Sequence, residues 1–256
     1  MSSAWQEAFR SSRERATIAV TPPDDVHSQT TFVPGNRLKT PRAAGFAGII
    51  FALLLGASYV LIRLSIPVDP STGPAWIDEQ AEMVTFALSL VPLSGIAFLW
   101  FIGVIRDRVG DAEDRFFATV FLGSGLLYLA MLFVSAGLAG ALVATYQAEP
   151  VGSVESGLYA YGREVTYRIS SVYAIRMAGV FMISLGTIFV RTKVAPRWLA
   201  ILTYGLALIL LVSVNYSLWL TLVFPAWVLM ISLHILWANL RSGGDFAKLP
   251  ESATEQ

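Results

Sequence analysis

Cysteine is absent from this chain of 256 residues. Its absence excludes disulfide bonds, thiolate metal ligands and thiol nucleophiles. Histidine is nearly as scarce, with two residues and no H-E-x-x-H motif. We therefore expect no metal site.

Charged residues are scarce as well. Asp, Glu, Lys and Arg make up 14% of the chain, against about 25% in soluble domains. The 18 basic and 18 acidic residues cancel, so no global basic field attracts nucleic acid. No phosphate-binding loop or dinucleotide fingerprint is present either. We therefore expect neither a cofactor nor a nucleic-acid partner.

Apolar residues are abundant: 55% of the chain is hydrophobic, and the mean hydropathy is +0.62. A bilayer core of about 30 Å needs roughly 20 apolar residues in a helix, and lipid leaves no alternative partner for backbone polar groups. The apolar stretches that meet or approach this length are 43–66, 83–105, 116–146, 169–190, 198–215 and 218–240. The predicted fold is therefore all-α, a polytopic membrane bundle of six transmembrane helices.

The polar segments suggest a simple domain plan. Residues 1–42 are polar and proline-rich, which predicts a largely disordered tail, with a short interfacial helix near its start as the alternative. Residues 43–240 form the transmembrane domain, and 241–256 form a second tail. The connections 67–82 and 147–168 are expected to be the longer outer loops.

Basic residues predict the orientation. If the N-terminus is cytoplasmic, 14 of the 18 Lys and Arg residues lie inside. The four that remain outside or within a span are Arg63, Arg163, Arg168 and Arg176. Because cytoplasmic loops carry the excess of Lys and Arg, both termini are predicted to be cytoplasmic.

Small residues at regular spacing suggest where helices meet. Ala44, Gly48, Ala52 and Gly56 follow one another at intervals of four. This spacing lets helix backbones approach closely in lipid. We expect this face to be buried against another helix, either of the same chain or of a second copy.

Two prolines lie inside predicted spans. Pro92 falls in the second span and Pro225 in the sixth. Proline removes a backbone donor and is expected to kink each helix. Tolerated bends are the simpler interpretation, and a substrate path is the alternative.

Ionisable residues within or bordering lipid are candidates for function because their burial is costly. Arg63, Glu82 and Arg176 all fall toward the outer side. We consider a polar cluster in which Glu82 pairs with Arg176. The alternative is that the arginines extend separately to the lipid headgroups.

The loop after the second span carries Gly103, Asp107, Arg108 and Gly110. This pattern resembles the cytoplasmic signature of major facilitator transporters. The chain departs from that family because Asp111 follows where basic residues are usual, and because six spans are expected rather than about twelve. A charged turn at Gly110, with paired Arg and Asp side chains, is the simpler interpretation.

His234 and Ser124 are weaker candidates. A Ser–His pair in a six-span protein invites comparison with intramembrane serine proteases, but Gly123 directly precedes Ser124 and the G-x-S-G string is missing. A packing role for both residues is the favoured interpretation.

Three strings resemble a set of actinobacterial multi-span membrane proteins without assigned activity. They are LIRLSIP at 61–67, GVIRDRVGDAEDRFFATVFLGSGLLY at 103–128 and, less specifically, VAPRWLAIL at 194–202. The resemblance implies a bacterial cytoplasmic membrane and assigns no catalytic residue.

The sequence leaves three hypotheses about function. The first is an accessory or structural membrane component, with the lipid bilayer and either a membrane protein or a second copy as partners. The second is a small transporter for an unknown solute. The third, a membrane enzyme acting on lipid-linked substrates, has the least support because no catalytic constellation is visible.

Overall fold

The computed structural model describes residues 41–66, 73–109, 115–192, 196–212 and 218–245. The chain divides into the units Met1–Arg37 and Leu38–Gln256, and all of these residues belong to the second. The described part is helical and contains no strand. Its elements are α2 (Pro41–Ser65), α3 (Trp76–Val109), α4 (Arg115–Ala148), α5 (Pro150–Glu155), α6 (Leu158–Arg168), the π-helix η2 (Ile169–Ala174), α7 (Ile175–Thr192), α8 (Arg197–Val212), the 3₁₀-helix η3 (Leu218–Leu222) and α9 (Val223–Asp245). The predicted N-terminal tail falls outside this part, apart from the start of α2.

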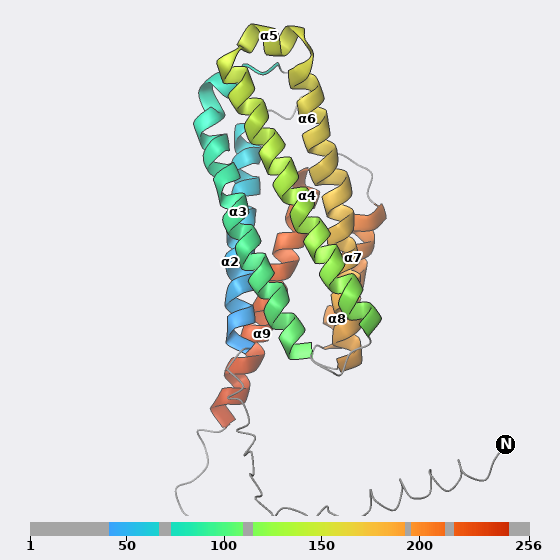
Figure 1. Ribbon diagram of the computed structural model, residues 1–256. Coiled ribbons are helices and arrows are strands. Elements are labelled where there is room, and N and C mark those ends of the chain that lie inside the picture. The colour runs from blue at the N-terminus through green and yellow to red at the C-terminus, as the bar shows by residue number, and fades with distance from the viewer. Residues whose placement is uncertain (1–40, 67–72, 110–114, 193–195, 213–217, 246–256) are drawn as a thin grey trace, which may run out of the picture. The chain divides into compact units, whose positions relative to one another are not determined.

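The long helices pack side by side as a bundle (Figure 1). Helix α2 packs between α3 and α9, α4 packs between α3 and α7, and α8 packs on α7. The short α5 crosses one end of the bundle, which we call the α5 end. Helix α2 begins and α9 ends at the opposite end, which we call the terminal end.

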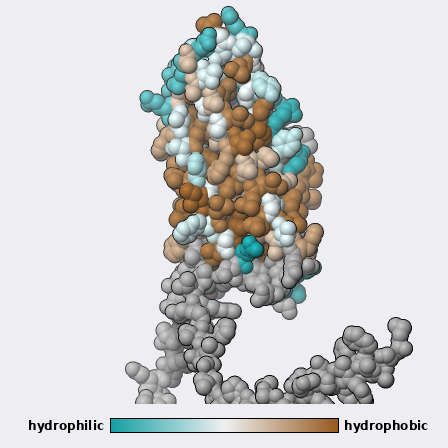
Figure 2. Space-filling view, in the orientation of Figure 1, coloured by the Kyte–Doolittle hydropathy of each residue, from teal (hydrophilic) through white to brown (hydrophobic). Residues whose placement is uncertain are grey.

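Five helices are long and apolar enough to cross a membrane. They cover Gly45–Ser65, Trp76–Arg106, Phe116–Ala148, Leu158–Arg191 and Leu220–Ala238. On the face shown in Figure 2, apolar side chains dominate between the ends of the bundle, and many hydrophilic residues lie at the α5 end. A surface this apolar is stable in lipid rather than in water. The prediction of an all-α, multi-span membrane protein is therefore confirmed at this level.

Helix α8 (Arg197–Val212) covers the described part of the fifth predicted span, 198–215, whose last residues lie outside the described ranges. Helix α8 has 16 residues, about 24 Å at 1.5 Å per residue. It runs antiparallel to α7 in close contact: a Cβ on Gly186 would lie 3.2 Å from Thr203 Cγ2, and one on Gly179 would lie 3.2 Å from the carbonyl oxygen of Ala207.

The structure corrects the boundaries of the two predicted outer loops, because the end of 67–82 and most of 147–168 are helical. Helix α3 begins at Trp76, inside the predicted loop 67–82, and α5 and α6 occupy most of 147–168. Hydropathy marks the part of a helix that favours lipid, and it does not mark where the helix ends. Asp78 and Glu79 in the first turn of α3 favour its early start because acids stabilise a helix N-terminus.

These extra turns have a small core of their own. Ile77, Ala81 and Val84 of α3 pack with two residues of α4 and with Tyr159 of α6. The indole Nε1 of Trp76 also donates a hydrogen bond to Tyr159 Oη at 2.9 Å. The α5 end is thus a packed helical extension of the bundle.

The prolines occupy different environments. Pro92 lies within α3, which is helical on both sides of it, so its predicted kink stays a prediction. Pro225 lies in the first turn of α9, directly after η3. The helix thus changes from 3₁₀ to α geometry within the predicted sixth span, beside Pro225, and the kink predicted at Pro225 stays a prediction. Helix α9 continues beyond the predicted 240 to Asp245, whereas its apolar span covers Leu220–Ala238.

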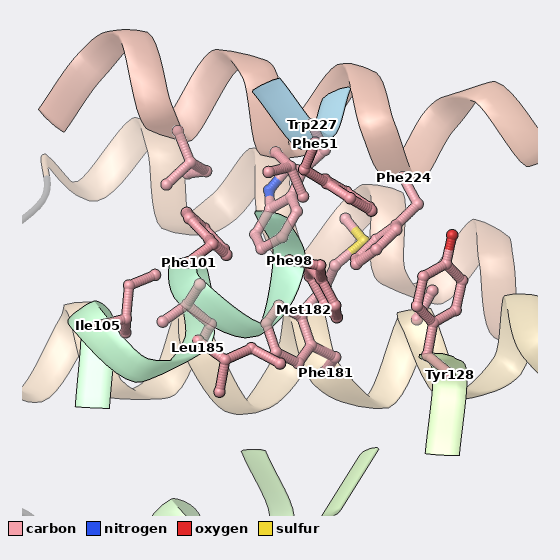
Figure 3. Packing of buried hydrophobic residues seen from close by; sticks show 14 of the residues in the cluster. Phe51, Phe98, Phe101, Ile105, Tyr128, Phe181, Met182, Leu185, Phe224 and Trp227 are labelled. Atoms are coloured by element: carbon pink, nitrogen blue, oxygen red, sulfur yellow. The ribbon is translucent and has the colours of Figure 1, made fainter. Parts of the chain in front are cut away.

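Aromatic side chains fill the centre of the bundle (Figure 3). The ring of Phe98 lies within 4.6–6.2 Å of the rings of Phe51, Phe101, Tyr128, Phe181 and Phe224, measured between centroids. These rings come from α2, α3, α4, α7 and α9, so one contact network joins five helices. We call it the aromatic core: Phe51, Phe98, Phe101, Phe121, Tyr128, Phe181, Phe224 and Trp227.

Helix α8 joins this core through a hydrogen bond. Trp227 Nε1 donates to Thr203 Oγ1 at 2.9 Å, and Thr203 Oγ1 donates to the carbonyl oxygen of Leu199 at 2.8 Å. All three residues are buried. A buried indole N–H needs such a partner, so this contact fixes α8 to α9.

Candidate functional site

Among the described residues, no ion pair joins Arg63, Glu82 and Arg176 to one another. Arg168 forms an ion pair with Glu164 on α6, 2.6 Å apart. Arg63 and Arg176 are half-buried and Glu82 is exposed. No carboxylate of the described residues lies within 4.0 Å of Arg176.

The predicted small-residue face is close-packed over part of its length. A Cβ on Gly48 would overlap Ser232 Oγ of α9 and would lie 2.8 Å from Phe101 Cδ2. Ala52 is buried as well, whereas a Cβ on Gly56 would have nothing within 4 Å. The side chain of Ala44 lies outside the described part. The close contact is therefore made with α9 of the same chain, at the Gly48 level.

The predicted loop motif is described only at its start. Gly103 is exposed on α3, and a Cβ there would meet nothing within 4 Å. The helix continues through Asp107 and Arg108 to Val109, so these two residues are helical rather than part of a turn. Their side chains and Gly110 lie outside the described part.

Among the described residues, no hydrogen bond joins Ser124 to His234, so the two do not form a catalytic pair. The hydroxyl of Ser124 donates to the carbonyl oxygen of Val120 on its own helix, at 2.7 Å. His234 is half-buried on α9. In the ranges that the structure covers, no group of three His, Asp or Glu side chains could hold a metal ion.

The π-helix η2 creates a polar site that the sequence did not reveal. The carbonyl oxygen of Thr166, just before η2, accepts hydrogen bonds from Ser135 Oγ of α4 at 3.2 Å and from Ser170 Oγ at 3.0 Å. Within η2, the carbonyl oxygen of Val172 accepts one from Arg176 Nη1 at 3.2 Å. We call these residues the polar layer: Ser135, Thr166, Ser170, Val172 and Arg176.

The polar layer lies where regular helix geometry is interrupted. A π-helix changes the hydrogen-bond pattern of the backbone for one turn and occurs frequently at functional sites. The 3₁₀-helix η3 contacts η2, so two stretches of irregular backbone lie together. Thr166 Oγ1 is buried and has no hydrogen-bond partner among the described atoms.

Further polar contacts hold the neighbouring helices together. Ser58 Oγ of α2 donates to the carbonyl oxygen of Ala87 on α3 at 2.7 Å. A side-chain hydrogen bond also joins Tyr59 of α2 to Tyr128 of α4. Such interhelical bonds stabilise helix packing in lipid by up to about 1–2 kcal/mol each.

The polar layer contains few groups that could take part in a reaction. Its serine hydroxyls donate to backbone carbonyls, and neither of them pairs with a base. Arg176 is its charged member, and a guanidinium remains protonated in proteins. The arrangement is therefore suited to tying helices together and to binding an anion, rather than to acid–base catalysis.

Comparison with known proteins gives no match to a family model, to a curated protein or to a solved structure. The interpretation of the site therefore depends on its geometry.

Proposed function

We propose that this protein is an accessory or structural component of a bacterial cytoplasmic membrane. The observation that supports this role most strongly is the aromatic core. Bulky rings from five helices occupy the centre of the bundle, where a transport pathway would need polar groups or space. A rigid, packed bundle is suited to holding a partner, which we take to be a membrane protein or a second copy.

We further propose that α8 is a sixth crossing and that both termini are cytoplasmic. Antiparallel packing supports this topology: Gly45 of α2 lies against Leu236 of α9, and Gly48 lies against Ser232. An even number of crossings returns the chain to its starting side. The predominance of Lys and Arg in the segments assigned to that side supports its cytoplasmic location.

The bacterial membrane is proposed from sequence. The strings at 61–67 and 103–128 resemble actinobacterial membrane proteins without assigned activity. That resemblance supports a location and no reaction.

A small transporter is the second candidate. The specific observation in its favour is the contact between η2 and η3, because irregular backbone within membranes often borders a substrate path. This candidate predicts that proteoliposomes containing the purified protein take up small solutes faster than empty liposomes. The accessory role predicts equal rates.

The accessory role also predicts a stable neighbour in the cell. A photo-crosslinking amino acid at Tyr161, which is 70% exposed on α6, or at Trp100, which is 68% exposed on α3, should give one discrete protein adduct. The same amino acid at the buried Tyr159 should give none and is the matched control. Lipid adducts alone at both exposed positions would contradict the proposal.

A further inference from the structure

Helix α6 carries a charged pair on its open side. The helix packs against α4 and lies at one edge of the bundle (Figure 1). The paired side chains of Glu164 and Arg168 are 50% and 57% exposed. Tyr161, one turn closer to the α5 end, is 70% exposed. We call Tyr161, Glu164 and Arg168 the α6 face.

A contact between α4 and α6 gives the depth of this face. The carbonyl oxygen of Thr166 on α6 accepts a hydrogen bond from Ser135 Oγ on α4. Thr166 lies midway between Glu164 and Arg168 in sequence, so both charged residues lie within about 3 Å of this level along the helix axis. The α6 face therefore lies beside the part of α4 around Ser135.

That part of α4 belongs to the apolar region of the bundle. Ser135 lies near the middle of the apolar span Phe116–Ala148. Its neighbours Val134 and Leu138 are 51% and 36% exposed. Apolar side chains exposed at this level are stable in lipid, so we infer that the hydrocarbon layer reaches the level of the α6 face.

Charged side chains are costly on a surface that faces lipid. Within membranes they almost always face the interior of a bundle or a water-filled cavity, or they pair with one another. The ion pair between Glu164 and Arg168 leaves half of each side chain exposed. Tyr161 is suited to the headgroup region, but Arg168 lies seven residues deeper, about 10 Å along the axis. The α6 face therefore needs a cover of complementary charge.

We propose that a second copy of this chain covers the α6 face and forms a two-fold symmetric dimer in the membrane. A neighbouring acid and base are self-complementary: across a two-fold axis, Glu164 of each copy accepts hydrogen bonds from the partner's Arg168. The Lys and Arg distribution inserts both copies in the same orientation, so the two α6 helices run in the same direction.

The reach of Arg168 fits this arrangement. Its Nε lies 2.6 Å from Glu164 Oε1, so the guanidinium already extends one turn toward the α5 end. A guanidinium has five N–H donors and a carboxylate accepts several hydrogen bonds, so each group can keep its own partner and join the other copy. Similar interhelical ion pairs link the helices of coiled coils. The inference rests on the accessory role for the existence of a partner, and it names that partner.

Cross-linking in native membranes tests the contact. The chain has no native cysteine, so a short bifunctional maleimide can join Tyr161→Cys only to a second copy. Most of this variant should shift to twice the monomer mass. Phe86→Cys is the matched control, because Phe86 is 57% exposed on α3, which lies on the other side of α4 from α6 (Figure 1). It should remain at the monomer mass.

Exchanging the charges tests the pairing. Arg168→Glu gives the α6 face two acids and Glu164→Arg gives it two bases, so neither variant should dimerise with itself. When the two are co-expressed with different affinity tags, they should co-purify, because every pair across the interface is then opposite in sign.

An apolar variant keeps the test decisive if the charge exchanges do not fold. Glu164→Leu/Arg168→Leu makes the α6 face stable in lipid and should raise the dissociation constant of the dimer about tenfold. Energy transfer between copies labelled at Glu251→Cys, followed as proteoliposomes are diluted with lipid, measures this constant.

Three results would overturn the proposal. The first is a wild type that stays monomeric in proteoliposomes, or cross-links no better at Tyr161→Cys than at Phe86→Cys. The second is a leucine double variant that dimerises as tightly as the wild type. The third is a pair of folded charge variants that stay apart when co-expressed.

The accessory role is tested separately by the photo-crosslinking amino acid at Tyr161. A monomeric wild type that gives an adduct with a different protein would contradict the dimer and leave the accessory role standing. A monomeric wild type that gives lipid adducts alone, at Tyr161 and at Trp100, would contradict both.

Discussion

Gly48→Ala is expected to lower the thermal stability of the detergent-solubilised protein markedly. The new Cβ would overlap Ser232 Oγ and would lie 2.8 Å from Phe101 Cδ2. The side chains of Ser232 and Phe101 would have to move, and overpacking of this kind costs about 1–3 kcal/mol. Gly48→Leu should be more severe, because its larger side chain would have to enter the same contact.

Two further variants test whether the clash at Gly48 causes the expected loss of stability. Gly56→Ala on the same helix adds the same atom where nothing lies within 4 Å, so stability should be unchanged or slightly higher. Ser232→Ala removes the atom that clashes, and Ser232 Oγ has no hydrogen-bond partner among the described residues. The double variant Gly48→Ala/Ser232→Ala should therefore be more stable than the sum of the single changes predicts. Equal effects at Gly48 and Gly56 would refute the close contact between α2 and α9.

Phe98→Ala is expected to be the most destabilising of these changes. Phe98 is fully buried, and its ring contacts five other rings of the aromatic core. Removing a buried phenylalanine side chain costs about 3–5 kcal/mol, because the cavity left behind is only partly refilled. The loss of stability is measured by unfolding the detergent-solubilised protein with heat or with denaturant.

Phe86→Ala is the control for Phe98→Ala. Phe86 lies on the same helix, α3, and its side chain is 57% exposed. The same atoms are deleted there without opening a cavity, so the change should cost well under half as much. If Phe98→Ala were tolerated as well as Phe86→Ala, the centre of the bundle would be loosely packed, and the transporter candidate would gain.

The sequence predicted the apolar helices because lipid imposes one simple requirement. A membrane helix must be apolar along about 20 residues, and this property is local. Where the helices end depends on other contacts. Trp76 and Ile77 fall in a segment that resembles a polar loop, yet they join a small core with α4 and α6, and this core extends all three helices.

The site was less predictable for a related reason. The sequence singles out Arg176 because its charge falls in an apolar run, and it favours Glu82 as a partner because both residues fall toward the outer side. Depth does not fix direction around a helix axis, and no ion pair joins the two in the described part. The sequence gives little signal of the π-helix at 169–174, apart from the adjacent Ser170 and Ser171. Its hydrogen bonds depend on Ser135, a residue 31 positions from Thr166 in sequence.

The topology is the central claim, and single-cysteine labelling in intact cells tests it most directly. The chain has no native cysteine to give background. Val151→Cys on α5 is suited to the α5 end because Val151 is 68% exposed, whereas the neighbouring Ser153 is buried. Arg197→Cys lies at the start of α8, and Glu251→Cys lies beyond the end of α9.

With a membrane-impermeant maleimide, Val151→Cys should react in intact cells. Arg197→Cys and Glu251→Cys should both react only after the membrane is permeabilised, since α8 and α9 together make two crossings. Labelling of Arg197→Cys and Glu251→Cys from opposite sides would mean that α8 does not cross the membrane, and would contradict the six-helix topology.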